Sequence, residues 1–159
     1  MKSLYRGLMV AALQCVIVLS LAGKYALDRE RLPRVWVKTA PYDPMLPVRG
    51  RYVSLRLQVE TLADTNLTWT SARLAVVDGR LVATPVKSGD GVLISPTANQ
   101  TWVINEPVAF FIAEHVKDPS RRAAGEELWV EVSVPSTGAP RPLRLGVKRD
   151  GVLKPLDLR

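Results

Sequence analysis

The residues best suited to acid–base chemistry are few, and one of them, Asp43, lies far from the others in the chain. His115 is the only histidine among 159 residues, and Glu114 and Asp118 are its acidic neighbours. Together with Asp43, Glu114 and His115 form the one polar set that could serve a hydrolase-like envelope enzyme. Neither a Gly-x-Ser-x-Gly phrase nor a phosphate-binding glycine loop accompanies them. The sequence therefore assigns no catalytic residue and favours a non-catalytic protein, with an enzyme as the alternative.

Metal and disulfide chemistry find little support in the composition. Cys15 is the only cysteine, and it lies inside an apolar N-terminal segment. An intramolecular disulfide is therefore impossible, and the usual zinc and copper ligand sets, which draw on several His and Cys side chains, are excluded. We expect no metal and no cofactor.

The positive charge is spread too evenly to predict nucleic-acid binding. The chain carries 22 basic and 15 acidic residues, a formal net charge of +7. Lys2, Arg6 and Lys24 flank the apolar segment, and no basic run elsewhere is longer than Arg121-Arg122. A nucleic-acid surface needs clustered basic residues with interleaved aromatic residues. We expect no nucleic-acid partner.

The apolar segment predicts a membrane anchor. Residues 8–23 carry no charge, and roughly 20 residues are needed to span the hydrocarbon core as a helix. The segment reaches that length if the long side chain of Lys24 extends its ammonium to the interface. We therefore expect residues 1–27 to anchor the chain in a lipid bilayer, residues 28–34 to be a juxtamembrane linker, and residues 35–159 to form an extracytoplasmic domain.

A cleaved signal peptide is the competing interpretation. Lys2 and Arg6 make a basic n-region, and Ser20-Leu21-Ala22 offers small residues at the −3 and −1 positions of a cleavage site. Basic residues are more numerous after the segment than before it, which by itself opposes export. A short basic n-region before a leading apolar segment is nevertheless typical of anchors whose N-terminus stays inside. We expect the domain on the outer side.

From Val35 onward, period-two alternation predicts strands. Tyr52–Glu60 places Val and Leu on one face and polar residues on the other, and Leu128–Val134 and Leu143–Lys148 alternate in the same way. Val108–Ala113 is apolar on both faces and predicts a central, fully covered strand. The fold class is mainly β: an antiparallel sandwich or partly open barrel of about seven to nine strands, preceded by one N-terminal transmembrane helix.

Asp78-Gly79 is the strongest hairpin signal in the chain. Asp-Gly tolerates the positive φ angles of a type I′ turn, which matches the twist of the flanking strands. A two-residue turn here predicts three cross-strand pairs: Val77 with Arg80, Val76 with Leu81, and Leu74 with Ala83. Asp150-Gly151 predicts a second hairpin, which Pro155 limits.

The stretch of residues 40–57, APYDPMLPVRGRYVSLRL, carries the most specific phrase. It resembles the GDYXXLXY family of bacterial proteins, in which a "DP…LLRGDYVxLxY" phrase follows a short first strand. Two signature positions differ here, because Arg51 replaces the Asp and Leu57 replaces the final Tyr. Leu57 faces the predicted core and keeps that position apolar. Arg51 reverses the charge at the start of the strand.

The resemblance implies architecture and topology rather than a reaction. It implies one N-terminal membrane segment, a β-rich domain, and placement in the bacterial inner membrane with the domain on the periplasmic side. Family members are often encoded near a multi-spanning membrane protein, which implies an integral membrane partner. Asp43, Arg49, Gly50 and Tyr52 are the candidate binding residues. The alternative is that Asp43 stabilises its own turn, Arg49 is solvated and Tyr52 packs at a sheet edge.

Overall fold

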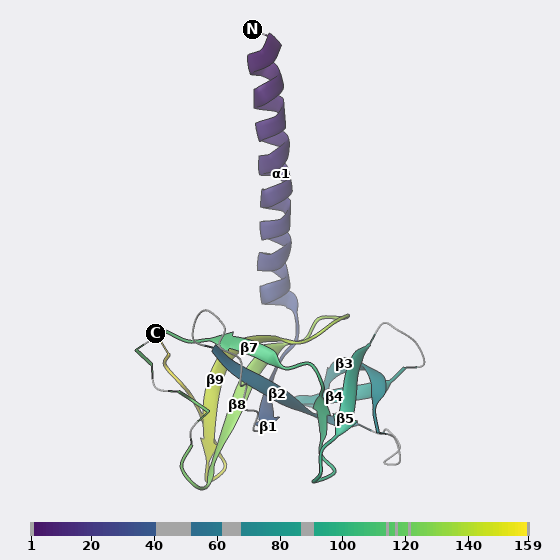
Figure 1. The fold of residues 1–159 in the computed structure, drawn as a ribbon, viewed down its shortest axis with the longest axis vertical. Helices are drawn as coiled ribbons and strands as arrows, with labels where there is room; N and C mark the ends of the chain where they lie inside the picture. Colours follow the sequence, from purple (N-terminus) through teal and green to yellow (C-terminus); the bar gives the residue numbers. More distant parts are fainter. Residues whose placement is uncertain are drawn as a thin grey trace. The chain divides into compact units, whose positions relative to one another are not determined.

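The computed structural model describes residues 2–40, 52–61, 68–86, 91–113, 115–116, 118–120 and 122–158. The chain divides into two compact units, Met1–Leu32 and Pro33–Arg159. The first contains one helix, α1 (Lys2–Arg31), which continues into the segment expected to be a linker. The second is the β domain (Figure 1).

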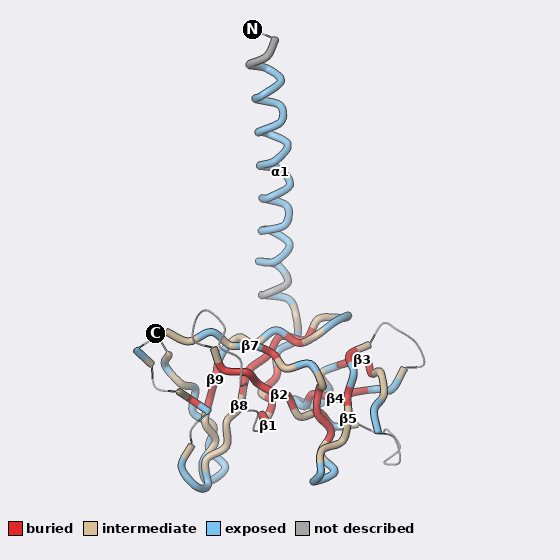
Figure 2. Tube along the Cα trace, viewed as in Figure 1, coloured by how far each residue is buried: buried red, intermediate tan, exposed pale blue. Residues whose placement is uncertain are grey.

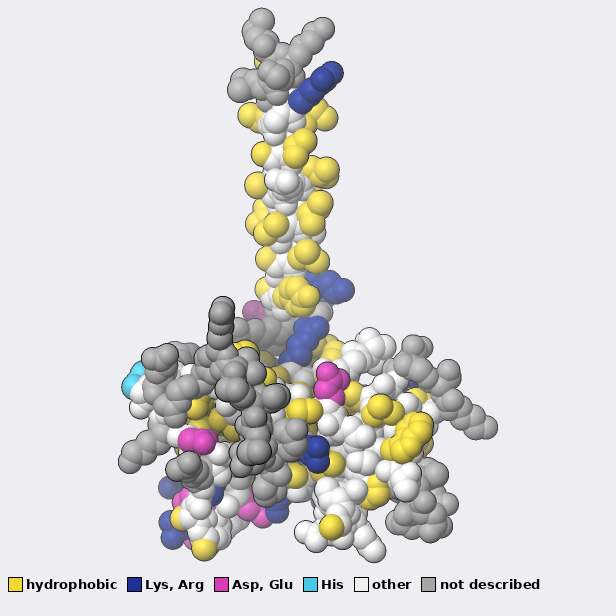
Figure 3. Space-filling view, viewed as in Figure 1, with side chains coloured by type: hydrophobic (Ala, Val, Ile, Leu, Met, Phe, Trp, Pro, Cys, Tyr) yellow, Lys and Arg dark blue, Asp and Glu magenta, His cyan; other side chains and the backbone are white. Residues whose placement is uncertain are grey.

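Helix α1 contains an apolar stretch long enough to cross a membrane. This stretch, Tyr5–Leu27, is 23 residues long, and no part of it is buried inside the protein (Figure 2). Hydrophobic side chains cover the helix on the visible face, with basic side chains at both ends (Figure 3). The structure thus confirms one N-terminal apolar helix, as both a membrane anchor and a signal sequence require.

The β domain contains ten strands within the described residues. In chain order they are β1 (Arg34–Ala40), β2 (Tyr52–Thr61), β3 (Thr70–Val77), β4 (Arg80–Pro85), β5 (Val92–Pro96), β6 (Trp102–Ile104), β7 (Val108–Phe111), β8 (Glu126–Ser133), β9 (Arg141–Arg149) and β10 (Val152–Pro155). The mainly-β prediction is confirmed, and the strand number exceeds the expected seven to nine.

Strand β2 belongs to two parts of the domain. Its second half closes a five-stranded barrel in the order β2-β4-β3-β5-β6, because β6 pairs back with β2. Its middle pairs with β1, which continues into a sheet through β8 and β9 to β10. The expectation of a sandwich or partly open barrel is therefore wrong in detail, since the barrel is closed. The purely antiparallel expectation is also wrong, because β2 and β4 run parallel.

Both predicted hairpins are confirmed. Strands β3 and β4 pair in the predicted register, which includes Val77–Arg80, Val76–Leu81 and Leu74–Ala83. Asp78 and Gly79 have φ angles of 49° and 72°, as the type I′ turn requires. Asp150 and Gly151 likewise have positive φ angles and join β9 to β10.

The prediction of a central, covered strand at residues 108–113 is wrong. Strand β7 pairs only with the first half of β2 among the described strands, so it is an edge strand. Phe111 at its end is 73% exposed. Continuous apolar character predicts burial on both faces, but an edge strand with an exposed aromatic residue has the same sequence pattern.

The core lies inside the barrel and under the inner face of the sheet. Leu55 and Leu57 on β2, Ile94 on β5 and Leu145 on β9 are almost completely buried. The alternating positions of β1, Val35 and Val37, join them. Outward positions on the same strands are therefore the ones available for binding.

Candidate functional site

Three of the four predicted binding residues lie outside the described residues: Asp43, Arg49 and Gly50. Tyr52, the fourth, begins β2 and packs against Phe111 of β7, with ring centroids 6.1 Å apart. This contact agrees with the alternative that Tyr52 packs at a sheet edge. His115 is exposed, and Glu114 and Asp43 also lie outside the described residues. The enzyme alternative stays a prediction.

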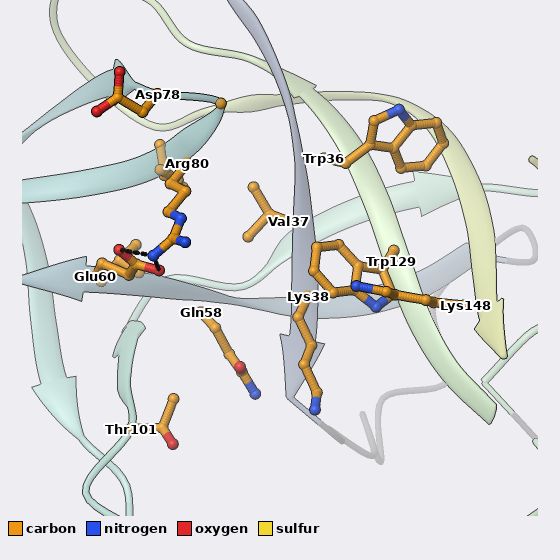
Figure 4. A pocket seen from close by; sticks show the side chains of 13 residues that line it. Trp36, Val37, Lys38, Gln58, Glu60, Asp78, Arg80, Thr101, Trp129 and Lys148 are labelled. Carbon is orange, nitrogen blue, oxygen red and sulfur yellow. Dashed lines mark hydrogen bonds and ion pairs between the residues drawn. The ribbon is translucent and has the colours of Figure 1, made fainter. Parts of the chain in front are cut away.

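A cavity lies among β1, β2 and β4, with further lining from β8 and β9. We call this open cavity of about 570 Å³ the β1–β4 groove (Figure 4). Its lining comes from three places: the sheet (Trp36, Val37, Lys38, Trp129, Lys148), the floor on β2 (Gln58, Val59, Glu60), and the barrel side (Asp78, Gly79, Arg80, Leu81, Thr101).

Strand alternation places the sheet-side residues in the groove. Val35 and Val37 point into the core, so Trp36 and Lys38 point outward from β1. On β8, Trp129 lies directly opposite Lys38. The ring of Trp36 lies over Gly146 of β9, where a Cβ atom would come within 2.9 Å of Trp36 Cζ3. Because Gly146 has no side chain, the Trp36 ring has room to pack against β9.

Cationic and aromatic side chains contact one another on this wall. The Lys148 ammonium lies 4.6 Å from the centroid of the Trp129 ring, a cation–π distance (Figure 4). Lys38 Nζ donates to Glu127 Oε1 at 2.5 Å, and Trp129 Nε1 donates to Glu127 Oε2 at 3.1 Å. These contacts orient the indole ring from two sides.

Glu127 is held in its ionised form by its neighbours. Hydrogen bonds from Lys38 and then from Trp129 lower the pKa of the Glu127 carboxyl group, against a smaller opposing effect of burial. A lowered pKa contributes stability above the pKa of the unfolded chain, and this contribution is lost as pH falls through the lowered value. Both partners are about 40% exposed, so solvent weakens the ion pair.

The barrel side of the groove carries a second ion pair. Arg80 Nη1 donates to both carboxylate oxygens of Glu60, at 3.2 and 3.4 Å. Asp78, at the tip of the hairpin, points away from this pair (Figure 4). Thr101 and Gln58 add a hydroxyl and an amide to the lining. The two walls thus present hydrogen-bonding groups around a partly apolar channel.

The described lining carries charged, amide, hydroxyl and aromatic side chains. It contains no histidine, cysteine or serine, and its two carboxylates and three cations include the Glu60–Arg80 pair. No group of three or more His, Cys, Asp or Glu side chains that could hold a metal occurs in the described part of the chain. Half-buried aromatic rings, such as Trp36 and Trp129, beside charged and amide groups are typical of ligand recognition.

Sequence reasoning missed this groove, although part of its signal was present. Trp36 and Trp129 each occupy the outward position of an alternating strand, where a large aromatic residue is unusual unless it is covered or binds something. Their proximity depends on β1 pairing with β8, which has no local sequence signature.

Comparisons with models of known protein families, with curated proteins and with solved structures find no match to this chain.

Proposed function

We propose that the chain is a membrane-anchored, non-catalytic interaction module of the bacterial cell envelope that acts with an integral membrane protein. The observation that carries the proposal is the apolar stretch Tyr5–Leu27 of α1, which the described part of the chain leaves unburied. Transfer of such a surface into a bilayer is strongly favourable. The β1–β4 groove supplies the binding surface, with Trp36 and Trp129 as its aromatic residues.

The inner membrane and the periplasmic side belong to the same proposal. Lys2 and Arg6 precede the apolar stretch, as in single anchors whose N-terminus stays in the cytoplasm. The resemblance of residues 40–57 to the GDYXXLXY family supports a bacterial envelope protein with a membrane partner. A retained anchor keeps the domain near the bilayer, so proteins of the same membrane are favoured partners.

Photo-cross-linking in intact cells tests the membrane partner. We expect p-benzoylphenylalanine at Gln58, on the groove floor, to give an adduct with an integral membrane protein that resists carbonate extraction. Val16→Arg places a charge in the middle of the apolar stretch, which makes the free energy of membrane insertion less favourable by about 3 kcal/mol. That variant should move to the soluble fraction and lose the adduct.

The matched control places the cross-linker at Thr84, an exposed position on the barrel strand β4 that does not line the groove. An equal adduct yield from Thr84, or membrane retention of Val16→Arg, would contradict the proposal.

Alkaline phosphatase fused to the C-terminus tests the side of the membrane. The enzyme is active only after export, so we expect an active fusion in the carbonate-resistant fraction. Mass spectrometry of the fusion should show the intact N-terminal segment. An inactive fusion would place the domain in the cytoplasm, and loss of residues 1–22 would identify a cleaved signal peptide.

A further inference from the structure

The β1–β4 groove is a position alongside β2 that no described strand occupies. On one side, β2 pairs with β1 at Arg56 and Leu57 and with β4 at Glu60 and Thr61. On its opposite side, Gln58 and Val59 pair with β6. Between these contacts, Gln58 and Val59 have no described strand partner on this side, which leaves a gap two residues long. The lining of the groove matches this gap.

The edge of β1 that faces the groove carries backbone groups without a strand partner. Pro33 O accepts a hydrogen bond from Val134 N, so the odd-numbered residues of β1 direct their N–H and C=O groups toward β8. Trp36 therefore directs its backbone groups away from β8. On that edge the pairing with β2 covers only Thr39 and Ala40 among the described residues.

An extended peptide is the ligand whose chemistry fits this edge. Along a strand edge, donors and acceptors repeat every two residues, and only another extended backbone presents the complementary repeat. Strand addition to an exposed edge uses these main-chain hydrogen bonds for affinity and neighbouring side chains for specificity. The groove supplies such neighbours from both walls, with Trp129 on one and Arg80 on the other.

Charge complementarity indicates the side chain that the peptide should carry. Lys38 and Arg80 each form an ion pair with a carboxylate of this chain. Lys148 instead rests on the Trp129 ring and lies opposite Glu127 on β8, the carboxylate that already forms its ion pair with Lys38. Lys38 and Lys148 thus share one carboxylate, Glu127, and an acidic side chain on the ligand would balance the second cation, with the indole ring holding Lys148 in place.

We propose that the β1–β4 groove binds an extended, acidic peptide segment of a partner protein, which pairs with the edge of β1 at Trp36 and places a carboxylate at Lys148. This inference rests on the proposed binding function and names the chemistry of the partner segment. It does not depend on the side of the membrane or on the identity of the partner.

Peptide selection on the full chain in phosphatidylcholine nanodiscs tests the inference. The probe is a phage-displayed library of random dodecapeptides, counter-selected on empty nanodiscs. We expect the enriched peptides to contain Asp or Glu. Methylating single backbone nitrogens at alternate positions should weaken binding, measured by fluorescence anisotropy, at least about tenfold, because each methyl group removes a main-chain donor.

Charge variants test the assigned carboxylate site. Lys148→Glu should lower the affinity for the enriched peptides at least about tenfold, and Lys148→Gln should lower it by less. The matched control, Lys154→Glu on the edge strand β10, lies outside the groove and should change affinity less than about twofold. Unfolding midpoints of the three variants separate a binding defect from a folding defect.

Several outcomes would overturn the inference: absence of enriched peptides, indifference to backbone methylation at every position, or equal effects of Lys148→Glu and Lys154→Glu. Stronger binding of soluble oligosaccharides than of any peptide would assign the groove to another ligand class and would also overturn it. If peptides fail while the Gln58 adduct with a membrane protein persists, strand addition is wrong and the interaction function stands.

Discussion

Leu57→Ala is expected to destabilise the β domain by about 2–5 kcal/mol, the usual cost of removing a fully buried leucine side chain. Leu57 is completely buried, and it lies on β2, which pairs with β1, β4, β6 and β7. A cavity here affects the barrel and the sheet together. Chemical unfolding of the full chain in detergent, followed by tryptophan fluorescence, measures the loss as a lower midpoint.

Leu93→Ala is the matched control for this substitution. Leu93 lies on β5 of the same barrel but is 47% exposed, so its truncation should cost less than about 1 kcal/mol. Similar midpoints for the two variants would contradict the assignment of Leu57 to the core. Leu57 is also one of the two positions that depart from the GDYXXLXY phrase, and its burial agrees with the expected role of an apolar filler.

Local features of the fold were predictable because they depend on neighbouring residues. The Asp78-Gly79 turn determines both the hairpin and its register, since a type I′ turn leaves one way to pair the flanking strands. Alternation along Tyr52–Glu60 likewise identified the buried face of β2. The parallel pairing of β2 with β4 and the closure of the barrel join distant segments, and no local pattern indicates them.

The candidate site was harder to predict because pairing between distant strands creates it. The predicted binding residues came from the most specific phrase of the sequence. Of these, Tyr52 lies in the first half of β2, which pairs with β7. The groove is instead lined by Gln58 and Glu60 from the second half of β2. Outward alternation could identify Trp36 and Trp129 individually. Their meeting with Lys148 requires three strands to pair in one order, which is a tertiary property.

Gly91→Ala is expected to destabilise the barrel by about 1–3 kcal/mol, the usual cost of overpacking a close-packed interior. An added Cβ would lie 2.7 Å from the carbonyl oxygen of Ala72 and 2.9 Å from its backbone nitrogen. These atoms belong to β3, which pairs with β5 through Ala72 and Val92. Backbone atoms inside a sheet cannot move aside as a side chain does, so the start of β5 must separate from β3.

Gly79→Ala gives a comparison with a different physical origin. No atom lies within 4 Å of its added Cβ, but Gly79 has a φ of 72°, so the substitution costs about 1–2 kcal/mol in backbone strain. Hydrogen exchange separates the two: Gly91→Ala should speed exchange in the β3–β5 ladder at Ser71, Ala72 and Leu93, and Gly79→Ala at the turn between β3 and β4. Unchanged exchange and an unchanged unfolding midpoint in Gly91→Ala would contradict the close approach of β5 to Ala72.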